Sequence, residues 1–537
     1  MLRSGRLHFE SFAKHYLKFF RRIPGYWEFL VLGLGTGLCL FPIPGIQLIL
    51  LFTISRFVFL IDTPVRWTHF LGHIWAFGFG FFTLSLYWIS HALLIELDVF
   101  WWLLPFGFFG IPAFLSAVMA FLSIWFLGWS YWVDSKFLRL VFLQFGYANT
   151  RCVGRLIMVA FWWGSVEYFL SSFCTGFPWA LLGYSWSPVL VVAQTASLGS
   201  VYTLSFLTVC VAGIPYLVFS QSVSRFTRLH LVTSSVVVIG LLIFGLIRLN
   251  TPVELTPLSV RIVHPSIDQT PEWHLGEQMM RLDTLLRLSQ LGSRPADVVI
   301  WPEAALGFYL EGQALQKKLG RAILPESHLI FGAVRRNDSR TRIWNSLYVL
   351  NHQGEIKAVY DKHHLVPFGE YVPLRRWLAY FLPADKIRKI TSGLLDFSEG
   401  KGPDVVTVLG LPSFSPMICY EAIFPGQVTP TGRDRPQWLL HITNDAWFGQ
   451  SVGPYQHFQI ARMRAIEEGL PILRAANAGV STIIDPYGRI LAQRSGPDMG
   501  VVEGFLPKAL PRRPFCAKFF KLMAWFDQFN PMTRKKN

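Results

Sequence analysis

Long apolar runs fill the first part of the chain and predict helices that cross a membrane. A membrane-spanning helix needs about 20 predominantly apolar residues. Seven segments approach this pattern, although Arg56 interrupts the second and the sixth is long enough to be broken; they cover residues 27–42, 45–62, 70–92, 103–129, 154–172, 189–219 and 231–249. The chain up to residue 250 therefore predicts a polytopic α-helical membrane domain of about seven spans.

After residue 250 the pattern changes to short apolar runs that alternate with amphipathic stretches. Amphipathic helices are predicted at 273–291, 312–321 and 456–468, and residues 480–492 predict a closing hairpin. Strands are predicted at 258–264, 298–301, 328–334, 346–350, 356–360, 405–409, 415–419 and 438–442. This alternation is typical of one large α/β domain. We therefore divide the chain into a leader (1–26), a membrane domain (27–250), an α/β domain (251–510) and a basic tail (511–537).

The composition separates the same two parts. The whole chain is 52% hydrophobic and 15% charged, whereas soluble domains carry about 25% charged residues. The first 250 residues hold 15 basic and 7 acidic side chains, and the remaining 287 hold 34 and 26. The formal net charge of +16 would suit a nucleic-acid partner, but the basic residues of the first part alternate with apolar spans instead of forming one stripe. We expect no nucleic-acid partner.

The positions of Lys and Arg predict how the spans are oriented. Basic residues occur in the leader and in the loops after the second, fourth and sixth segments, whereas the loops near 42–45, 91–102 and 175–187 contain none. Loops rich in Lys and Arg stay in the cytoplasm, so the leader is expected there and seven crossings place the α/β domain on the opposite side. Because no small-residue cleavage site is evident after the first segment, we expect an anchor and not a removable signal peptide.

Two polar features of the membrane half each have two interpretations. Glu167 lies within a predicted span, where a carboxylate is often functional, but it equally fits a residue near the outer end that faces other helices or water. The sequence Thr175-Gly-Phe-Pro-Trp179 would shape a lipid entry site, or would simply be a turn with the aromatic side chains usual at a membrane surface.

The α/β domain contains three side chains whose chemistry is complementary. Cys419 is the only cysteine between residues 258 and 514, so this domain forms no internal disulfide, and a lone cysteine on an apolar run is commonly plain core. Glu421 just beyond it makes a strand-to-helix corner plausible, and such corners expose nucleophiles. Glu303 and Lys362 each follow a predicted strand, where such residues are usually just solvated. Together, a thiol, a carboxylate base and an ammonium that holds an oxyanion would support nucleophilic catalysis.

Ordered motifs around these residues resemble a known family. Trp301-Pro-Glu303, Tyr360-Asp-Lys362 with the following His-His-Leu-Val-Pro-Phe-Gly-Glu370, and Ile418-Cys-Tyr-Glu421 resemble the Glu-Lys-Cys triad of the nitrilase superfamily. The membrane half, Thr443-Asn-Asp-Ala-Trp-Phe-Gly449 and Gly453-Pro-Tyr-Gln-His457 narrow the resemblance to the apolipoprotein N-acyltransferase family, over nearly the whole chain. The resemblance implies a nitrilase-like αββα sandwich on the periplasmic side of a bacterial inner membrane.

The resemblance also implies a two-step acyl transfer, the last step of bacterial lipoprotein maturation. Glu303 would act as general base toward Cys419, which would attack an ester of a phospholipid, typically phosphatidylethanolamine. Lys362 and the backbone N–H of Tyr420 would stabilise the oxyanion, and a thioester would form as lysophospholipid leaves. The α-amino group of the N-terminal diacylglyceryl-cysteine of an apolipoprotein would then take the acyl chain. No cofactor is implied.

Further residues are assigned supporting roles by their match to family motifs. Glu370 would orient or electrostatically support the triad, and Glu421 would support the corner after the nucleophile. Asn345 matches a supporting polar position. Trp447 and Trp273 match aromatic residues that line the site or its mobile loops, with interfacial packing as the alternative for both.

Three features depart from the family pattern. The first strand of the α/β domain runs into Val263-His-Pro-Ser-Ile-Asp-Gln269, where relatives usually have a Val-Gln-Gly type loop, and Ala478 follows Asn477 where a second Asn is common. Relatives end with an eighth membrane helix, whereas residues 514–530 here contain Lys518, Lys521 and Asp527 and are too short and charged to span. We expect this tail to be amphipathic and to lie on the membrane surface.

Two other classes of function are compatible with parts of the sequence. A membrane-tethered nitrilase-like amidase or hydrolase would use the same triad with water as acceptor, although a mere anchor needs only one span. A polytopic transporter or lipid-binding protein would carry the α/β domain in an inactive form. No cysteine or carboxylate cluster has the spacing of metal ligands, so we expect no metal.

Overall fold

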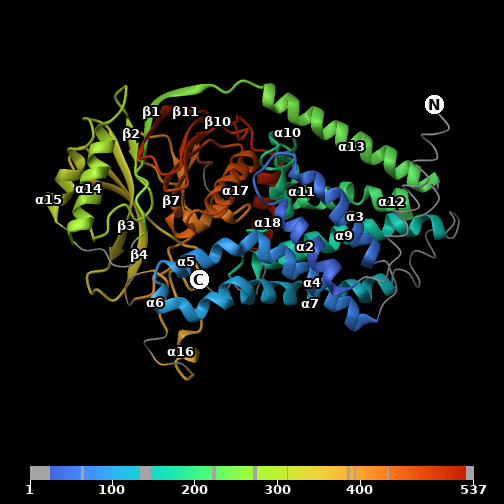
Figure 1. Cartoon of the computed structure of the whole chain (residues 1–537). Helices are drawn as coiled ribbons and strands as arrows, with labels where there is room; N and C mark the ends of the chain where they lie inside the picture. Colours follow the sequence, from blue (N-terminus) through green and yellow to red (C-terminus); the bar gives the residue numbers. More distant parts are fainter. Residues whose placement is uncertain are drawn as a thin grey trace.

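The computed structural model describes residues 25–61, 66–132, 147–173, 175–220, 225–269, 275–310, 312–381, 383, 387–391, 393, 395–431 and 435–527. Two parts lie side by side in it: a bundle of helices and a pair of β-sheets (Figure 1). The bundle is built from the first 250 residues, and the sheets are built from the chain after them.

Each of the seven predicted apolar segments contains a helix. The main helices are α2 (Tyr26–Leu38), α3 (Ile49–Ile61), α4 (Trp67–Leu86), α7 (Ile111–Trp132), α9 (Tyr147–Ser172), α11 (Ala196–Ala212), α12 (Ile214–Ser220) and α13 (Arg225–Asn250). Shorter turns connect them: η1 (Ile46–Leu48), η2 (Tyr87–Ser90), α5 (His91–Leu94), α6 (Leu97–Phe100), η3 (Trp101–Leu103), η4 (Phe106–Gly110), η6 (Leu182–Trp186) and α10 (Leu190–Ala193).

Several of these helices have the length and composition of membrane spans. Within the described residues, four stretches are long and apolar enough to cross a membrane: Trp67–Leu94, Phe106–Trp125, Ala196–Phe219 and Arg228–Asn250. Helices α2 and α3 have 13 residues each, which is short of a full crossing. These apolar helices confirm a membrane-type helical domain.

Helix α11 is interrupted, as the length of the sixth apolar segment suggested. Gly199 and Ser200 leave helical geometry, and Ser200 has a φ of 73°. The N–H of Val201, which the break exposes, donates to Glu467 Oε1 at 2.8 Å. A carboxylate from the α/β domain therefore caps the second half of this helix.

The strands form two sheets. The first has the order β11-β1-β2-β3-β4-β5 and the second β10-β9-β8-β7-β6. The strands are β1 (Leu255–His264), β2 (Val298–Ile300), β3 (His328–Arg336), β4 (Ile343–Asn351), β5 (Ile356–Asp361), β6 (Phe414–Ile418), β7 (Trp438–Asn444), β8 (Ile472–Asn477), β9 (Val480–Ile484), β10 (Ile490–Ser495) and β11 (Gly500–Pro507). β1, β2 and β3 are parallel, and so are β6, β7 and β8.

Alternating side chains place helices outside both sheets. Val298 and Ile300 enter the core between the sheets, whereas Val299 packs with Leu285 of α14 (Leu275–Gln290) on the outer face. Helix α15 (Gln313–Gly320) shares that outer core, and α17 (Gly453–Glu468) covers the outer face of the second sheet. This arrangement confirms the expected αββα sandwich.

Three strand predictions need correction. Residues 405–409 form no strand, because only one isolated bridge joins Val406 to Phe414 and positive-φ glycines, Gly402 and Gly410, flank the run. Strands β8 and β11 were not predicted. β8 includes the polar and small residues Arg474-Ala-Ala-Asn477, which have low strand propensity, and burial between neighbouring strands overrides that propensity.

The helix of the C-terminal tail packs on the rest of the protein at its start. Helix α18 (Phe515–Asp527) contacts α11 and α17. Cys516 and Ala517 are buried, and Lys521 Nζ donates to the carbonyl of Pro430 at 3.0 Å. Whether the remainder of the tail lies on a membrane surface stays a prediction.

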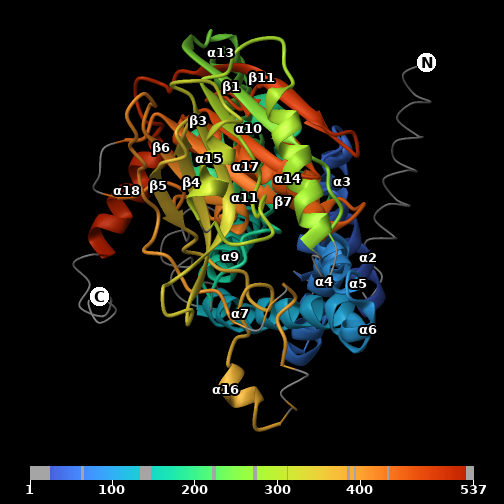
Figure 2. The same cartoon turned by 90° about the vertical axis from the view of Figure 1, so that its left-hand side faces the viewer.

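The two halves share one hydrophobic core. Tyr420, Phe424 and Ile466 of the sheet half belong to the same buried cluster as Trp163 and Leu182 of the helical half. Helix α17 lies between the second sheet and α11 (Figure 1). In contrast, α16 (Arg375–Leu378) projects away from both halves in the two views (Figures 1 and 2).

Candidate active site

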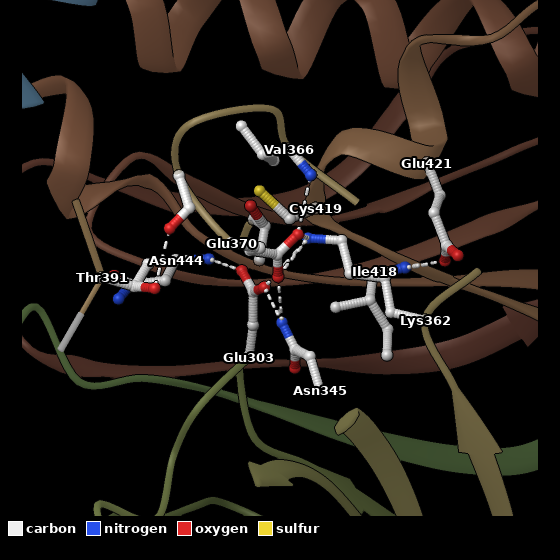
Figure 3. Close-up of polar contacts among 12 residues, drawn as sticks. Glu303, Asn345, Lys362, Val366, Glu370, Thr391, Ile418, Cys419, Glu421 and Asn444 are labelled. Carbon is white, nitrogen blue, oxygen red and sulfur yellow. Dashed lines mark hydrogen bonds and ion pairs between the residues drawn. The ribbon is translucent and has the colours of Figure 1, made fainter. Parts of the chain in front are cut away.

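Three strand ends bring Glu303, Lys362 and Cys419 together. Glu303 follows β2, Lys362 directly follows β5, and Cys419 directly follows β6. Figure 3 shows the three side chains converging with Asn345 and Glu370 between the two sheets. The first two come from one sheet and the thiol from the other, so the site forms only when the sheets pack face to face.

Glu303 is buried and is held by two donors. Asn345 Nδ2 donates to its Oε1 at 2.7 Å, and the backbone N–H of Asn444 donates to its Oε2 at 2.8 Å. Lys362 Nζ lies 3.6 Å from Oε1. These contacts fix the plane of the carboxylate. Neither hydrogen-bond donor is an acid that would protonate it.

Lys362 is anchored by Glu370. Its Nζ lies 3.0 Å from the Glu370 carboxylate, which also accepts from Asn345 Nδ2 at 2.9 Å and from the N–H of Val366 at 2.9 Å. Asn345 therefore bridges Glu303 and Glu370. The predicted supporting residues Asn345 and Glu370 lie in contact with the triad.

Cys419 sits on a sharp corner between β6 and the 3₁₀ turn η8 (Cys419–Ile423). Its φ is 51°, a left-handed conformation that ordinary side chains rarely adopt. Glu421 closes the corner, because its carboxylate accepts from the N–H of Ile418 at 2.7 Å, the N–H of His363 at 2.7 Å and the hydroxyl of Tyr360 at 3.0 Å. This is the strand-to-helix corner that the sequence made plausible.

The electrostatics of the three side chains suit acyl transfer. Burial, and after it the Glu303 carboxylate, raise the pKa of the Cys419 thiol, so the resting thiol keeps its proton. Burial also raises the pKa of Glu303, which makes it a better proton acceptor. For Lys362, burial opposes the charge, but Glu370 and Glu303 together raise its pKa and keep it cationic.

The aromatic predictions have different outcomes. Trp447 lies half-buried in η9 (Asp445–Phe448), directly after β7, and its contribution to the site stays a prediction. Trp273 lies outside the described residues. Tyr420 packs its ring against Phe177 and donates its hydroxyl to the carbonyl of Gly176 at 2.8 Å.

The loop that contains Gly176 and Phe177 therefore touches the residue after the proposed nucleophile. His364 Nε2 lies 2.7 Å from the carbonyl of Thr175, and Trp179 Nε1 donates to Gln456 Oε1 at 2.8 Å. This loop forms part of the contact between the halves. Glu167, the other polar feature of the membrane half, is buried and accepts from Trp163 Nε1 at 2.8 Å and from the N–H of Leu182 at 2.6 Å, so it faces other helices and not water.

Residues at the departures from the family pattern also lie near the site. Asn477 donates to Asn444 Oδ1 at 2.9 Å and exchanges hydrogen bonds of 2.8 Å with the backbone of Ile267. Asn444 Nδ2 donates to Gln269 Oε1 at 2.9 Å. The loop after β1 is thus tied, through two asparagines, to Glu303. Ala478 has a φ of 56°.

Five polar residues around the triad were not predicted as site residues: His441, Asn444, Asp445, His457 and Arg474. All five are buried. Asn444, Asp445 and His457 belong to motifs that carried the family resemblance, but a motif does not say which atom each side chain contacts. No group of three or more His, Cys, Asp or Glu side chains that could hold a metal ion occurs among the described residues.

Comparisons with known proteins match both halves of the chain. Residues 33–214 match the family model "Apolipoprotein N-acyltransferase N-terminal domain", and residues 260–504 match "Carbon-nitrogen hydrolase".

Similar full-length proteins include apolipoprotein N-acyltransferases from Rickettsia typhi and Rhodopseudomonas palustris. The first is 33% identical over 502 residues, covering 91% of this chain and 93% of that protein. The second is 36% identical over 459 residues, covering 81% and 79%. Among solved structures, an amidase from Nesterenkonia sp. has a TM-score of 0.31 and 17% identity, covering 48% of this chain and 93% of its own.

Proposed function

The chain belongs to the apolipoprotein N-acyltransferase family, and from this membership and the geometry of the site we propose which residues carry out its acyl transfer. It is a membrane acyltransferase with a carbon-nitrogen hydrolase catalytic domain. The donor, the roles of individual residues and the orientation in the membrane are the proposed parts.

In the first half-reaction, Glu303 takes the proton of the Cys419 thiol as Sγ attacks an ester carbonyl of the donor. Lys362 Nζ and the N–H of Tyr420 stabilise the oxyanion that develops. The tetrahedral intermediate collapses, the ester C–O bond breaks, and the departing alkoxide receives the proton from Glu303. The products are a thioester on Cys419 and a deacylated donor.

In the second half-reaction, the α-amino group of the acceptor attacks the thioester. Glu303 removes a proton from the attacking nitrogen, and the proton goes to the Cys419 sulfur as the C–S bond breaks. The acceptor is the N-terminal diacylglyceryl-cysteine of an apolipoprotein, which fits the name of the family. An amide forms and the free thiol is restored.

The observation that carries this proposal is the meeting of Glu303, Lys362 and Cys419 at three strand ends. The thiol keeps its proton at rest, the carboxylate has a raised pKa, and the ammonium stays charged. A protonated thiol needs a base at the moment of attack, and Glu303 is the carboxylate poised for that proton. No other cysteine lies in the chain between residues 258 and 514.

We propose a phospholipid, phosphatidylethanolamine in particular, as the acyl donor. A bilayer presents phospholipid esters to a domain that is packed directly on apolar helices. We further propose a multi-pass protein of a bacterial inner membrane with the catalytic domain on the periplasmic side. The alternation of basic and uncharged loops supports that orientation.

Replacing the thiol tests the proposal. Cys419→Ala should abolish N-acylation and thioester formation while the protein remains folded and inserted in the membrane. Mass spectrometry after incubation of the wild-type protein with phospholipid should find one acyl chain on the peptide that contains Cys419. Cys516→Ala, which removes a buried cysteine of α18, serves as the matched control. Unchanged N-acylation by Cys419→Ala would contradict the mechanism.

The same assay separates a transferase from a membrane-tethered hydrolase. A transferase holds the thioester until an amine arrives and then yields the N-acylated product. Rapid release of free fatty acid without acylation of a diacylglyceryl-cysteine peptide would favour the hydrolase.

A further inference from the structure

Two buried histidines lie against the backbone carbonyl of Cys419. His441 Nε2 is 3.1 Å from this oxygen, and His457 Nε2 is 3.2 Å from it. His441 lies on β7 and His457 on α17, so the contacts come from two different elements. Neither side chain has a role in the acyl transfer described above.

The neighbours of His441 determine which of its ring nitrogens carries the proton. Arg474 NH1 lies 2.6 Å from His441 Nδ1, and a guanidinium can only donate. Nδ1 is therefore the acceptor and the ring proton is on Nε2, which donates to the carbonyl of Cys419. Burial, and after it the charge of Arg474, hold the pKa of His441 well below its usual range, which agrees with a neutral ring.

Asp445 holds the rest of this group in place. Its Oδ2 accepts from Arg474 NH2 at 2.6 Å, and its Oδ1 lies 2.9 Å from His457 Nδ1. Both ring nitrogens of His457 face acceptors. Burial lowers the pKa of His457 while Asp445 opposes that shift. The contacts of His457 leave the position of its proton open, whereas the short contact from Arg474 to Nδ1 places the proton of His441 on Nε2.

The carbonyl of Cys419 and the N–H of Tyr420 belong to one planar peptide unit. In a trans peptide the N–H points opposite to the carbonyl oxygen, and this chain has no cis bonds among the described residues. Fixing the oxygen from one side therefore fixes the direction in which the Tyr420 N–H points. A hydrogen bond to the oxygen also polarises the amide and strengthens its N–H as a donor.

We infer that His441, with His457 beside it, is a positioning residue of the oxyanion hole: its bond to the Cys419 carbonyl aims and polarises the Tyr420 N–H. This inference rests on the proposed function, because it assumes that this N–H receives the oxyanion. His441 does not touch the substrate in this arrangement. It acts through the peptide unit between the nucleophile and the next residue.

Two substitutions of His441 separate its two contacts. In His441→Gln the amide nitrogen replaces Nε2, so the bond to Cys419 is kept and the contact to Arg474 is lost. In His441→Asn the shorter side chain can accept from Arg474 but does not reach Cys419. His328→Asn, which replaces a buried histidine of β3 away from the site, is the control for loss of a buried imidazole.

The rate of Cys419 acylation from phospholipid, measured on the full-length protein in detergent, should fall about tenfold in His441→Asn. His441→Gln should stay within threefold of the unmodified protein, and the KM for the donor should be alike in both variants. A second readout is the infrared band of a ¹³C-labelled thioester carbonyl on Cys419. A weakened oxyanion hole should move this band to higher frequency in His441→Asn and not in His441→Gln.

Equal rates and equal infrared bands in the two variants would overturn the inference. An equal loss in His328→Asn would likewise overturn it, because the effect would then be one of packing. If the wild-type protein never acquires an acyl group on Cys419, that result would instead contradict the proposed function, and the inference with it. Should neither His441 variant fold, the same comparison of His457→Gln with His457→Asn decides the question.

Discussion

Cys419 and Glu421 show how one residue can hold another in an unfavourable conformation. The left-handed backbone at Cys419 costs an ordinary residue about 1–2 kcal/mol. Glu421 offsets this cost with bonds from the N–H of Ile418, before the corner, and from His363, on the other side of the site. The carboxylate therefore holds the corner that presents the partly buried side chain of Cys419.

Glu421→Gln should lower stability by about 2 kcal/mol at neutral pH. Both oxygens of the Glu421 carboxylate accept hydrogen bonds from N–H groups. An amide has only one acceptor oxygen, so the NH₂ group of glutamine would face one of these N–H donors and their hydrogen bond would be lost. Burial alone would raise the pKa of Glu421, but His363 and the N–H donors hold it below its usual value. A carboxyl group whose pKa is lowered by folding stabilises the folded state at pH values above its pKa in the unfolded chain. This stabilisation is lost as the pH falls through its pKa in the folded protein.

The thermal unfolding midpoint in detergent measures this effect. The difference between the unmodified protein and Glu421→Gln should be largest near pH 7 and should shrink below about pH 4.5, the ordinary pKa of Glu. A difference that grows on acidification would contradict this assignment.

Ala478 is a second residue in the left-handed region, with a φ of 56°. Asn or Gly is favoured there over Ala. Ala478→Gly should raise the unfolding free energy by about 1 kcal/mol. Ala475→Gly, in the neighbouring strand and without a positive φ, is the matched control and should lower it. Equal changes in both variants would show that backbone strain is not the cause.

At the scale of elements, α17 connects the catalytic sheet to the helical half. Its Gln456 accepts from Trp88 Nε1 at 3.0 Å and from Trp179 Nε1 at 2.8 Å, and the next residue, His457, lies against Cys419. At its other end, Glu467 caps the break in α11. One helix therefore fixes the catalytic corner relative to the membrane helices.

Breaking the buried pair between Arg464 and Glu467 should destabilise this contact. The Arg464 NH2 to Glu467 Oε2 distance is 3.1 Å, and both side chains are almost fully buried. Glu467→Ala should lower the free energy of unfolding by about 3–5 kcal/mol, because it leaves the buried charge of Arg464 without a carboxylate and the N–H of Val201 without its acceptor. Replacing both partners with leucine should cost less than the sum of the single changes.

The unfolding midpoint should be measured at pH 8, above the value of about 7 to which burial raises the pKa of Glu467. Lys318→Ala is the control, because its pair with Asp283 is exposed and 3.4 Å long, and it should change stability by less than about 1 kcal/mol. A loss in Glu467→Ala as small as that of the control would contradict the role of the buried pair.

At the scale of the whole molecule, the shared core makes the helical half a platform for the enzyme domain. The last helix before the sheets, α13, buries only 6% of its apolar stretch against the protein, and it runs along the edge of the bundle before the chain enters β1 (Figure 1). A helix with so much exposed apolar surface needs lipid around it. The catalytic site thus lies in a domain that apolar helices hold at a membrane.

The proposed orientation predicts which parts a membrane-impermeant maleimide reaches. Leu409 is 96% exposed in the α/β domain, so Leu409→Cys should be labelled from outside intact spheroplasts. An epitope at the N-terminus should react with antibody only after the membrane is permeabilised. The unmodified chain is the control for labelling of native cysteines. The opposite pattern would overturn the orientation.

Much of the site could be anticipated because its chemistry is local in sequence. Glu303, Lys362 and Cys419 each follow a run that was predicted as a strand, and the short motifs around them resemble those of a known family. That resemblance implied their meeting, because the three strands belong to two different sheets. The network of His441, Asp445, His457 and Arg474 could not be anticipated in this way. Its members come from β7, η9, α17 and β8, and β8 itself was missed because its residues have low strand propensity.

The sequence by itself determined the division into an apolar helical half and an α/β half, and its resemblance to a known family implied the αββα class and the candidate reactive side chains. These features depend on composition, on the periodicity of apolar positions and on short motifs, all of which can be read from residues close together in the sequence. Only the tertiary structure decided that α17 and the loop at Gly176 join the halves, that Glu467 caps a broken helix, and that two imidazoles meet one carbonyl. Such contacts join residues tens to hundreds of positions apart, so their geometry depends on how the sheets and helices pack and not on local pattern.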